Sequence, residues 1–330
     1  MVCLYIRHLF VGGDINEVYG MTKPIFFPFN QMVKTPNKED CTPLIYYGGK
    51  SRDADWILSN FPASYKTLVD VFGGGAAICF RVGMAGKVVV YNDVGNVCHF
   101  MKMLRDHGAE LYRRLYFTPY SREEFEKSRA NWPAKMIAYK NETDSRRRRY
   151  YGLEWARQWY TTINQGYSHE EYANTWHKAI QVPSGSALAN HTDDLPKFVD
   201  RLRRMHVENM DFAQVIPEYD LETTLFYCDP PYLNETRVSK GNYLNEMTVD
   251  RHEELLKLLR TVKGQVVLSG YAHPLYDDLL KDWRRVTITH KSAIQNTSSM
   301  NGRGDRTEVL WVQEHHRGIW HQDGASSPVS

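Results

Sequence analysis

The chain has 330 residues, of which 42% are hydrophobic, and its formal net charge is +2. That length and composition can bury one large core, or a core with a smaller helical lobe, and they exclude a disordered or fibrous protein. No apolar run reaches the roughly 20 residues that a membrane span needs, and the first residues do not resemble a secretory signal. The cysteines form no CxxC pair, so we expect free thiols in a reducing cytoplasm and no structural zinc; they are Cys3, Cys41, Cys79, Cys98 and Cys228.

Positive charge is concentrated in the middle of the chain. Residues 105–205 hold 18 Lys and Arg against 13 Asp and Glu, a balance of +5 that leaves −3 for the remainder. Such a segment can bind a polyanion, although an ordinary solvated helical surface explains the excess about as well.

The first hundred residues contain two predicted strands. Residues 1–40 have no periodicity and several prolines and glycines, so we predict an irregular N-terminal extension in which Met21 is an alternative start. Apolar runs at 68–72 and 87–91 follow, the first ending at a triple glycine before a predicted helix start, the second at Asn92-Asp93. Two strand-to-loop steps about twenty residues apart are typical of an α/β nucleotide-binding sheet.

The rest of the chain divides into a helical segment and a second group of strands. Residues 105–205 are aromatic, basic and helical in pattern, with a predicted capping box at Ser121-x-x-Glu124, and we interpret them as an insertion. Strands are predicted at 225–228, 265–269 and 308–312. Between the first two of these, a helix is predicted to start at an Asp250-x-x-Glu253 cap, and residues 317–330 are predicted to be a flexible tail.

The most specific motif is Asp229-Pro230-Pro231-Tyr232, directly after an apolar strand. The two prolines end the strand and hold an extended loop at its carboxyl end, where ligands of open α/β sheets bind. The Asp229 carboxylate and the Pro230 carbonyl are both acceptors, so they can take the two hydrogens of an aromatic amino group and turn its lone pair toward an electrophile. Tyr232 would stack on a base flipped out of a duplex. The alternative is a chance Asp-Pro turn before an exposed tyrosine.

Three further features indicate a nucleoside ligand. The glycines at 73–75 let the backbone approach a ligand, and the helix start after them presents free N–H groups. Asp93 closes the next strand, where a carboxylate can accept both hydroxyls of a ribose. The turn Gly48-Gly49-Lys50 is the third feature, although a surface turn with a solvated lysine explains it equally well.

Together these segments resemble the Dam-like DNA adenine-N6 methyltransferases, including phage and prophage members. The resemblance rests on PLIYYGGK, DVFGGGAA, VVVYND, INQGYS and FYCDPPY in that order, and it covers about residues 43–312. It implies a class I α/β methyltransferase fold, with a catalytic domain at 41–104 and 206–316 and a helical target-recognition insert at 105–205. Two positions depart from the family pattern: Ala76 stands where a third spaced glycine is usual, and Tyr46 stands where many members have tryptophan.

The resemblance implies S-adenosylmethionine as the cofactor, double-stranded DNA as the substrate, and no metal. The residues implied to contact the cofactor are Tyr46, Lys50, Asp70, Phe72, Gly73, Gly74, Gly75, Asp93 and Asp229, and those implied to hold the target adenine are Asp229, Pro230, Pro231 and Tyr232. Asn164, Gly166 and Tyr167 belong to a segment similar to one that helps the family hold DNA, although a core-facing helix end explains them as well. Phosphate contacts, or else a solvated face, are predicted for Arg146, Arg147, Arg148 and Arg149.

We therefore predict a bacterial or phage cytoplasmic enzyme that methylates N6 of a flipped adenine in a specific DNA site by direct transfer, either beside a restriction partner or as an orphan. One alternative is N4-cytosine methylation, against which the leading aspartate of the motif argues because serine is common there. A second is methylation of a glutamine amide or an RNA base, whose enzymes generally lack a long basic insert. A catalytically inactive DNA-binding relative is the third, but it would have lost Asp229-Pro230-Pro231-Tyr232 or Asp93.

Overall fold

A computed structural model describes residues 42–44, 46, 48–167, 169, 171–178, 183–233, 247–290 and 306–313. The extension predicted at 1–40 and the tail predicted at 317–330 lie outside these residues. None of the described helices combines the length and apolarity that crossing a bilayer requires.

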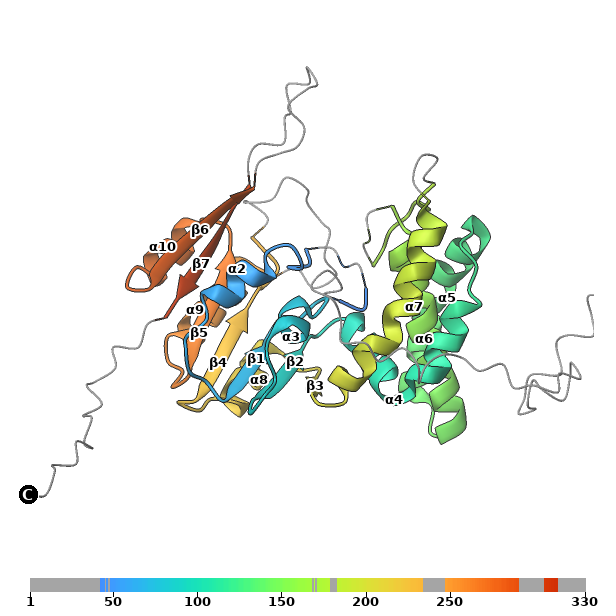
Figure 1. Cartoon of the computed structure of the whole chain (residues 1–330), viewed down its shortest axis with the longest axis horizontal. Helices are drawn as coiled ribbons and strands as arrows, with labels where there is room; N and C mark the ends of the chain where they lie inside the picture. The colour runs from blue at the N-terminus through green and yellow to red at the C-terminus, as the bar shows by residue number, and fades with distance from the viewer. Residues whose placement is uncertain are drawn as a thin grey trace, which may run out of the picture. The chain divides into compact units, whose positions relative to one another are not determined.

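Within the described ranges, the strands form one seven-stranded sheet (Figure 1) in the order β3-β2-β1-β4-β5-β7-β6. Strands β1 to β5 pair in parallel with one another, whereas β7 pairs antiparallel with both β5 and β6. The strands are β1 (Thr67–Asp70), β2 (Val88–Asn92), β3 (His206–Glu208), β4 (Thr224–Cys228), β5 (Gln265–Gly270), β6 (Arg284–His290) and β7 (Arg306–Val312). The predicted α/β class is confirmed.

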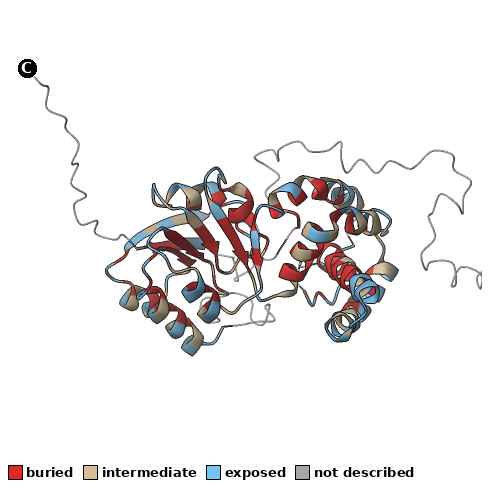
Figure 2. Cartoon of the chain, turned by 90° about the horizontal axis from the view of Figure 1, so that it is seen from below, coloured by how far each residue is buried: buried red, intermediate tan, exposed pale blue. Residues whose placement is uncertain are grey.

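The central strands are apolar on both faces because helices cover both. Val69, Phe226 and Val266 point into a core with α8 (Phe212–Glu218), α9 (Val249–Leu259) and α10 (Pro274–Leu279). On the other face, the rings of Tyr227 and Phe61 pack 5.8 Å apart, next to α2 (Ala54–Ser59) and α3 (Ala77–Arg81). Figure 2 shows that the central strands are buried, whereas strand residues at the edge of the sheet are exposed or intermediate. A sheet buried on both faces accounts for the runs of apolar residues without strict alternation.

Two strands escaped prediction, and one helix cap was wrong. Strand β3 has only three residues, and β6, which pairs only with β7, mixes basic and polar residues with apolar ones, so neither shows a clear apolar period. Helix α9 is capped by the Thr248 hydroxyl, which accepts a hydrogen bond from the Arg251 amide at 3.3 Å, whereas the expected cap, Asp250, lies inside the first turn.

Between β2 and β3 the described residues contain four helices and no strand of the sheet, namely α4 (Asn96–Tyr116), α5 (Arg122–Asn141), α6 (Ser145–Gln165) and α7 (Ser184–Leu202). The predicted Ser121 cap is confirmed, because its hydroxyl accepts the Glu124 amide at 3.1 Å. The reciprocal half of the capping box is absent: the Glu124 carboxylate accepts Arg157 at 2.7 Å, and the Ser121 amide donates to Gln165 at 3.1 Å. The domain boundaries around these helices remain a prediction.

Candidate active site

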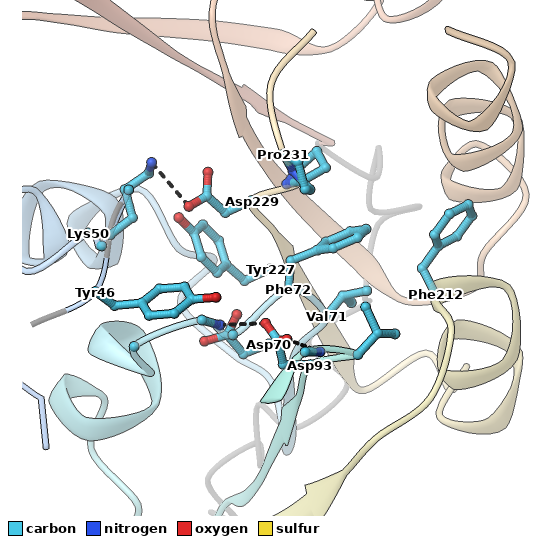
Figure 3. A pocket seen from close by; sticks show the side chains of 18 of the residues that line it. Tyr46, Lys50, Asp70, Val71, Phe72, Asp93, Phe212, Tyr227, Asp229 and Pro231 are labelled. Atoms are coloured by element: carbon cyan, nitrogen blue, oxygen red, sulfur yellow. Dashed lines mark hydrogen bonds and ion pairs between the residues drawn. The ribbon is translucent and has the colours of Figure 1, made fainter. Parts of the chain in front are cut away.

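A cavity of about 540 Å³ lies at the carboxyl ends of β1, β2 and β4 (Figure 3). Ligands of open α/β sheets bind at this edge. All the residues predicted to contact the cofactor or the target base line it, namely Tyr46, Lys50, Asp70, Phe72, Gly73, Gly74, Gly75, Asp93, Asp229, Pro230, Pro231 and Tyr232. The tertiary structure therefore brings together segments that lie far apart in the chain.

The glycine turn and Asp93 form one hydrogen-bonded unit. The Asp93 carboxylate accepts the Gly74 amide at 2.9 Å and the Gly95 amide at 2.6 Å. Burial raises the pKa of Asp93 above its ordinary value, against the effect of these two hydrogen bonds. A Cβ atom on Gly73 would lie 2.4 Å from the Tyr91 ring, so only glycine fits there. The turn leaves lone pairs of Asp93 directed at the cavity edge, since each carboxylate oxygen has two.

Asp70 is a buried carboxyl group at the end of β1. Its Oδ2 accepts the Cys79 thiol at 3.5 Å, and its Oδ1 has no hydrogen-bond partner among the described residues. Burial, together with the charges of Asp229 and Asp93, raises its pKa to about 8, even though the Cys79 hydrogen bond opposes the shift. A buried acceptor without a partner is costly unless a ligand supplies one.

The cavity is rich in acidic groups. Five carboxyl groups line it, those of Asp70, Asp93, Glu171, Asp211 and Asp229, against two cationic side chains, Lys50 and Arg251. Such a lining favours a ligand that carries positive charge.

Lys50 connects the glycine turn before α2 to the carboxylate at the end of β4. Its Nζ lies 3.1 Å from Asp229 Oδ2 and 3.6 Å from Glu308, and it donates to the Tyr232 hydroxyl at 2.5 Å. Burial alone would lower the pKa of Lys50, but the charges of Asp229, Tyr232 and Glu308 raise it well above its ordinary value. The lysine is therefore charged and buried, and the alternative that it is a solvated lysine in a surface turn is wrong.

Asp229 is surrounded by donors on both oxygens. Oδ2 faces Lys50, and Oδ1 accepts the Tyr232 hydroxyl at 3.2 Å. Burial raises the pKa of Asp229, although the charge of Lys50 opposes this shift. The Tyr232 ring packs edge-on against the Tyr271 ring, with 4.5 Å between centroids. In this structure the Tyr232 hydroxyl therefore contacts the Asp229 carboxylate while its ring contacts Tyr271.

Sequence reasoning missed several residues of this cavity. The Arg251 guanidinium donates two hydrogen bonds to Asp211, at 2.7 and 2.6 Å, and lies 4.2 Å from the centroid of the Phe212 ring. Asp211 caps α8 and Phe212 is its first residue, and both come shortly after β3, so a predicted strand there would have placed them at the carboxyl edge of the sheet. Asn92 does not line the cavity but supports its edge, because this buried side chain donates to the Val71 carbonyl at 2.8 Å and accepts the Met210 amide at 2.9 Å.

The residues predicted to bind DNA lie outside this cavity, on the helical segment. The side chains of Arg146 to Arg149 are exposed at the start of α6. Arg149 pairs with Glu110, and the Arg148 guanidinium lies 4.9 Å from the Tyr139 ring centroid. Among the described residues, neither Arg146 nor Arg147 forms an ion pair.

At the C-terminal end of α6, Asn164 and Gly166 are enclosed, whereas Tyr167 is exposed. Tyr167 is 71% exposed, whereas Asn164 is buried and donates within its own helix to the Tyr160 carbonyl at 2.9 Å. A Cβ atom on Gly166 would lie 2.5 Å from Ala173, so the turn requires glycine. In the described part of the chain, no group of three His, Cys, Asp or Glu side chains is placed to hold a metal ion.

Comparison with known proteins agrees with this geometry. The chain is 25% identical over 294 residues to the Type II methyltransferase M.FokI of Planomicrobium okeanokoites, an alignment covering 82% of this chain and 42% of that protein. It is 36% identical over 52 residues to the Type II methyltransferase M2.HphI of Haemophilus parahaemolyticus, covering 16% of each. The alignments thus cover less than half the length of either relative. The family model that describes the D12 class N6 adenine-specific DNA methyltransferases matches residues 46–296, from the Tyr46 turn past β6. With the sheet and its edge cavity, this match confirms the predicted class I S-adenosylmethionine-dependent methyltransferase fold, and the chain belongs to the D12 class family.

Proposed function

We propose that this protein transfers a methyl group from S-adenosylmethionine to the N6 amino group of adenine at a specific site in double-stranded DNA. The observation that carries the proposal is that Asp229 and Pro230 line the same cavity as the glycine turn and Asp93. A nucleoside bound by the turn and an amino group held by Asp229 would therefore meet in one enclosed space. The family supports the reaction, and two Type II methyltransferases among the relatives support site specificity.

The cavity lining fits the cofactor chemically. We propose that Asp93 accepts ribose hydroxyls and that Asp70, whose Oδ1 has no described partner, accepts the ammonium group of the methionine end. Phe212, beside the Arg251 guanidinium, offers a flat surface to an aromatic ring. The excess of carboxyl groups complements the sulfonium and ammonium charges. When bound, the sulfonium supplies an electrophilic methyl group.

The chemistry falls to Asp229 and Pro230. The two acceptors draw the amino hydrogens into the plane of the base, so that the nitrogen lone pair points at the methyl carbon. The amino nitrogen could then take the methyl group of the bound sulfonium, which would remain as a neutral thioether, and the Asp229 carboxylate that holds one amino hydrogen would pass the released proton to solvent. Lys50, which pairs with Asp229 at 3.1 Å, favours the ionised form of that carboxylate and so opposes the rise in its pKa that burial causes.

Tyr232 must change its contacts when a base enters. Its hydroxyl now donates to Asp229 Oδ1, one of the atoms that the amino group needs. We propose that the incoming adenine replaces this hydroxyl and that the ring stacks on the base, as flipped bases stack on aromatic side chains in other enzymes.

We propose that the helical segment is the target-recognition insert of a Dam-like enzyme, in the order cofactor motifs, insert, catalytic motif. Exposed arginines at the start of α6 suit phosphate contacts, and exposed Tyr167 suits contact with bases or sugars. Asn164 and Gly166, both enclosed, would support the turn that presents Tyr167.

The test is incubation of the purified protein with S-adenosylmethionine carrying a labelled methyl group and with duplex DNA of mixed sequence, followed by nucleoside analysis. We expect labelled N6-methyl-2′-deoxyadenosine from the DNA, at one sequence motif when the product is sequenced. Labelled N4-methylcytosine in place of methylated adenine would contradict the proposal and indicate an N4-cytosine methyltransferase. Tight DNA binding without any methylation would indicate the inactive relative.

A further inference from the structure

One wall of the cofactor cavity comes from the segment between α6 and α7. Glu171 lines the cavity together with Asp93, Val94 and Gly95. Its position is set by two side-chain donors from different helices: Asn96 of α4 donates to Oε1 at 2.7 Å, and the Trp159 indole of α6 donates to the same atom at 2.6 Å. A carboxylate so placed is oriented before any ligand arrives.

Glu171 retains capacity for a further donor. An ionised carboxylate has about four lone-pair sites. Within the described part of the chain, its donors are the Asn96 side chain, the Trp159 indole and the Asn96 backbone amide. Burial raises the pKa of Glu171, and the nearby charge of Asp93 raises it further, against these hydrogen bonds. The adjacent residues Gly95 and Asn96 donate to Asp93 and Glu171 respectively, so the two carboxyl groups lie near one another in the cavity lining, which is unfavourable unless a ligand donates to both.

A ribose diol is a ligand of that kind, because its two hydroxyl groups are adjacent donors. Asp93 already accepts two backbone amides, at 2.9 and 2.6 Å. We propose, building on the proposed function, that Glu171 accepts one ribose hydroxyl of the bound cofactor and thereby shares the diol with Asp93. The helical segment then contributes to cofactor binding as well as to DNA binding.

Calorimetry of S-adenosylhomocysteine binding tests this role. We expect Glu171→Gln, which removes the charge but keeps the shape, to weaken binding about tenfold, the value of one charge-assisted hydrogen bond. The matched control is Glu123→Gln, an exposed glutamate of α5 that should bind as wild type does. Trp159→Phe removes one donor that orients Glu171 and should weaken binding by a smaller factor.

The 2′-deoxy and 3′-deoxy analogues of the same ligand separate a ribose contact from a general structural effect. Wild type should lose affinity for both analogues, whereas Glu171→Gln should lose no further affinity for the analogue that lacks the hydroxyl it binds. Unchanged affinity of Glu171→Gln, or equal losses for all three ligands, would overturn the assignment. If wild type itself fails to bind S-adenosylhomocysteine, the proposed function fails first. Thermal melting of each variant checks that it is folded.

Discussion

The carboxyl edge of the sheet and the helical segment between β2 and β3 both contain clusters of charged side chains, but these differ in their exposure to solvent. At the sheet edge, Lys50 is 7% exposed and pairs with Asp229 inside a cavity. In the helical segment, the side chains of Arg146 and Arg147 are exposed to solvent. Charges buried in a cavity act at short range on one ligand, whereas exposed charges attract a polyanion and are screened by salt.

Burial alone does not distinguish a ligand site. The helical segment also contains a half-buried ion network, in which Arg157 binds Glu124 at 2.7 Å and Glu154 at 3.2 Å, while Arg114 binds Glu154 at 2.5 Å. These charges pair with one another and join α4, α5 and α6, although Nε of Arg114 has no hydrogen-bond partner among the described residues. At the sheet edge, by contrast, Asp70 keeps one oxygen without a described partner. The comparison teaches that a buried acceptor without a partner, when it lines a cavity, indicates a ligand site. Charged side chains that pair with one another between helices indicate packing.

The largest expected effect is at the sheet edge. Asp229→Ala should reduce methyl transfer at least about 100-fold, because it removes an acceptor aimed at developing charge. The protein should stay folded, because Lys50 retains Glu308 at 3.6 Å. Single-turnover transfer assays measure the loss, and exposed Asp250→Ala on α9 is the control. Near-normal turnover by folded Asp229→Ala would remove Asp229 from the catalytic site.

Asp93→Ala should weaken cofactor binding about tenfold to hundredfold, corresponding to about 1.5–3 kcal/mol for lost charge-assisted hydrogen bonds. Asp93→Asn keeps one acceptor oxygen and should lose less. Calorimetry with S-adenosylhomocysteine gives both values. Because Asp93 also holds the Gly74 and Gly95 amides, melting curves are needed alongside. Unchanged affinity in Asp93→Ala would refute the ribose contact.

A steric test sharpens the same region. Gly73→Ala should destabilise the protein by about 1–3 kcal/mol, the usual cost of overpacking, because the added Cβ would lie 2.4 Å from the Tyr91 ring. The control is Gly83→Ala, where an added Cβ has no neighbour within 4 Å. Urea unfolding compares the two variants, and equal stability would mean that the turn can shift to accept a side chain.

The exposed arginines predict a smaller effect, and one that depends on salt. Each arginine that contacts a phosphate should contribute about one unit to the slope of log affinity against log salt concentration. Arg146→Ala and Arg147→Ala should flatten that slope more than Arg148→Ala and Arg149→Ala, because Arg149 pairs with Glu110 and Arg148 lies over Tyr139. Duplex binding at several salt concentrations measures the slopes. Sequence preference should be unchanged; if it changes, these residues read bases.

The last expected effect is a dependence of stability on pH. In the folded protein, burial raises the pKa of Asp70 from its ordinary value of 3.8 to about 8. Between these values the folded protein holds a proton that the unfolded chain lacks, so the stability that Asp70 contributes falls as pH rises, by at most about 1.4 kcal/mol per pH unit. Asp70→Asn should therefore show a shallower decline in urea midpoint from pH 5 to 8 without cofactor. If Asp70→Asn and wild type show the same decline in urea midpoint, Asp70 is not the group that holds the proton.

The sequence by itself determined the parts of the protein that depend on neighbouring residues. The central apolar strands, the glycine turn, Asp93 and Asp229-Pro230-Pro231-Tyr232 are all local patterns, and the structure places the last three at one cavity. Periodicity and chain geometry act over a few residues, so they are visible in a single sequence.

Only the tertiary structure decided what these residues meet. Lys50 lies 3.6 Å from Glu308, a residue far from it in the sequence. The carboxylate of Glu171 lies at the cavity because Asn96 and Trp159 donate hydrogen bonds to it. Strand β3 forms because it pairs with β2, and that pairing places Asp211 and Phe212 in the cavity wall. Such contacts depend on long-range packing, which no local pattern encodes, and so the partners of the site residues became apparent only in the folded chain.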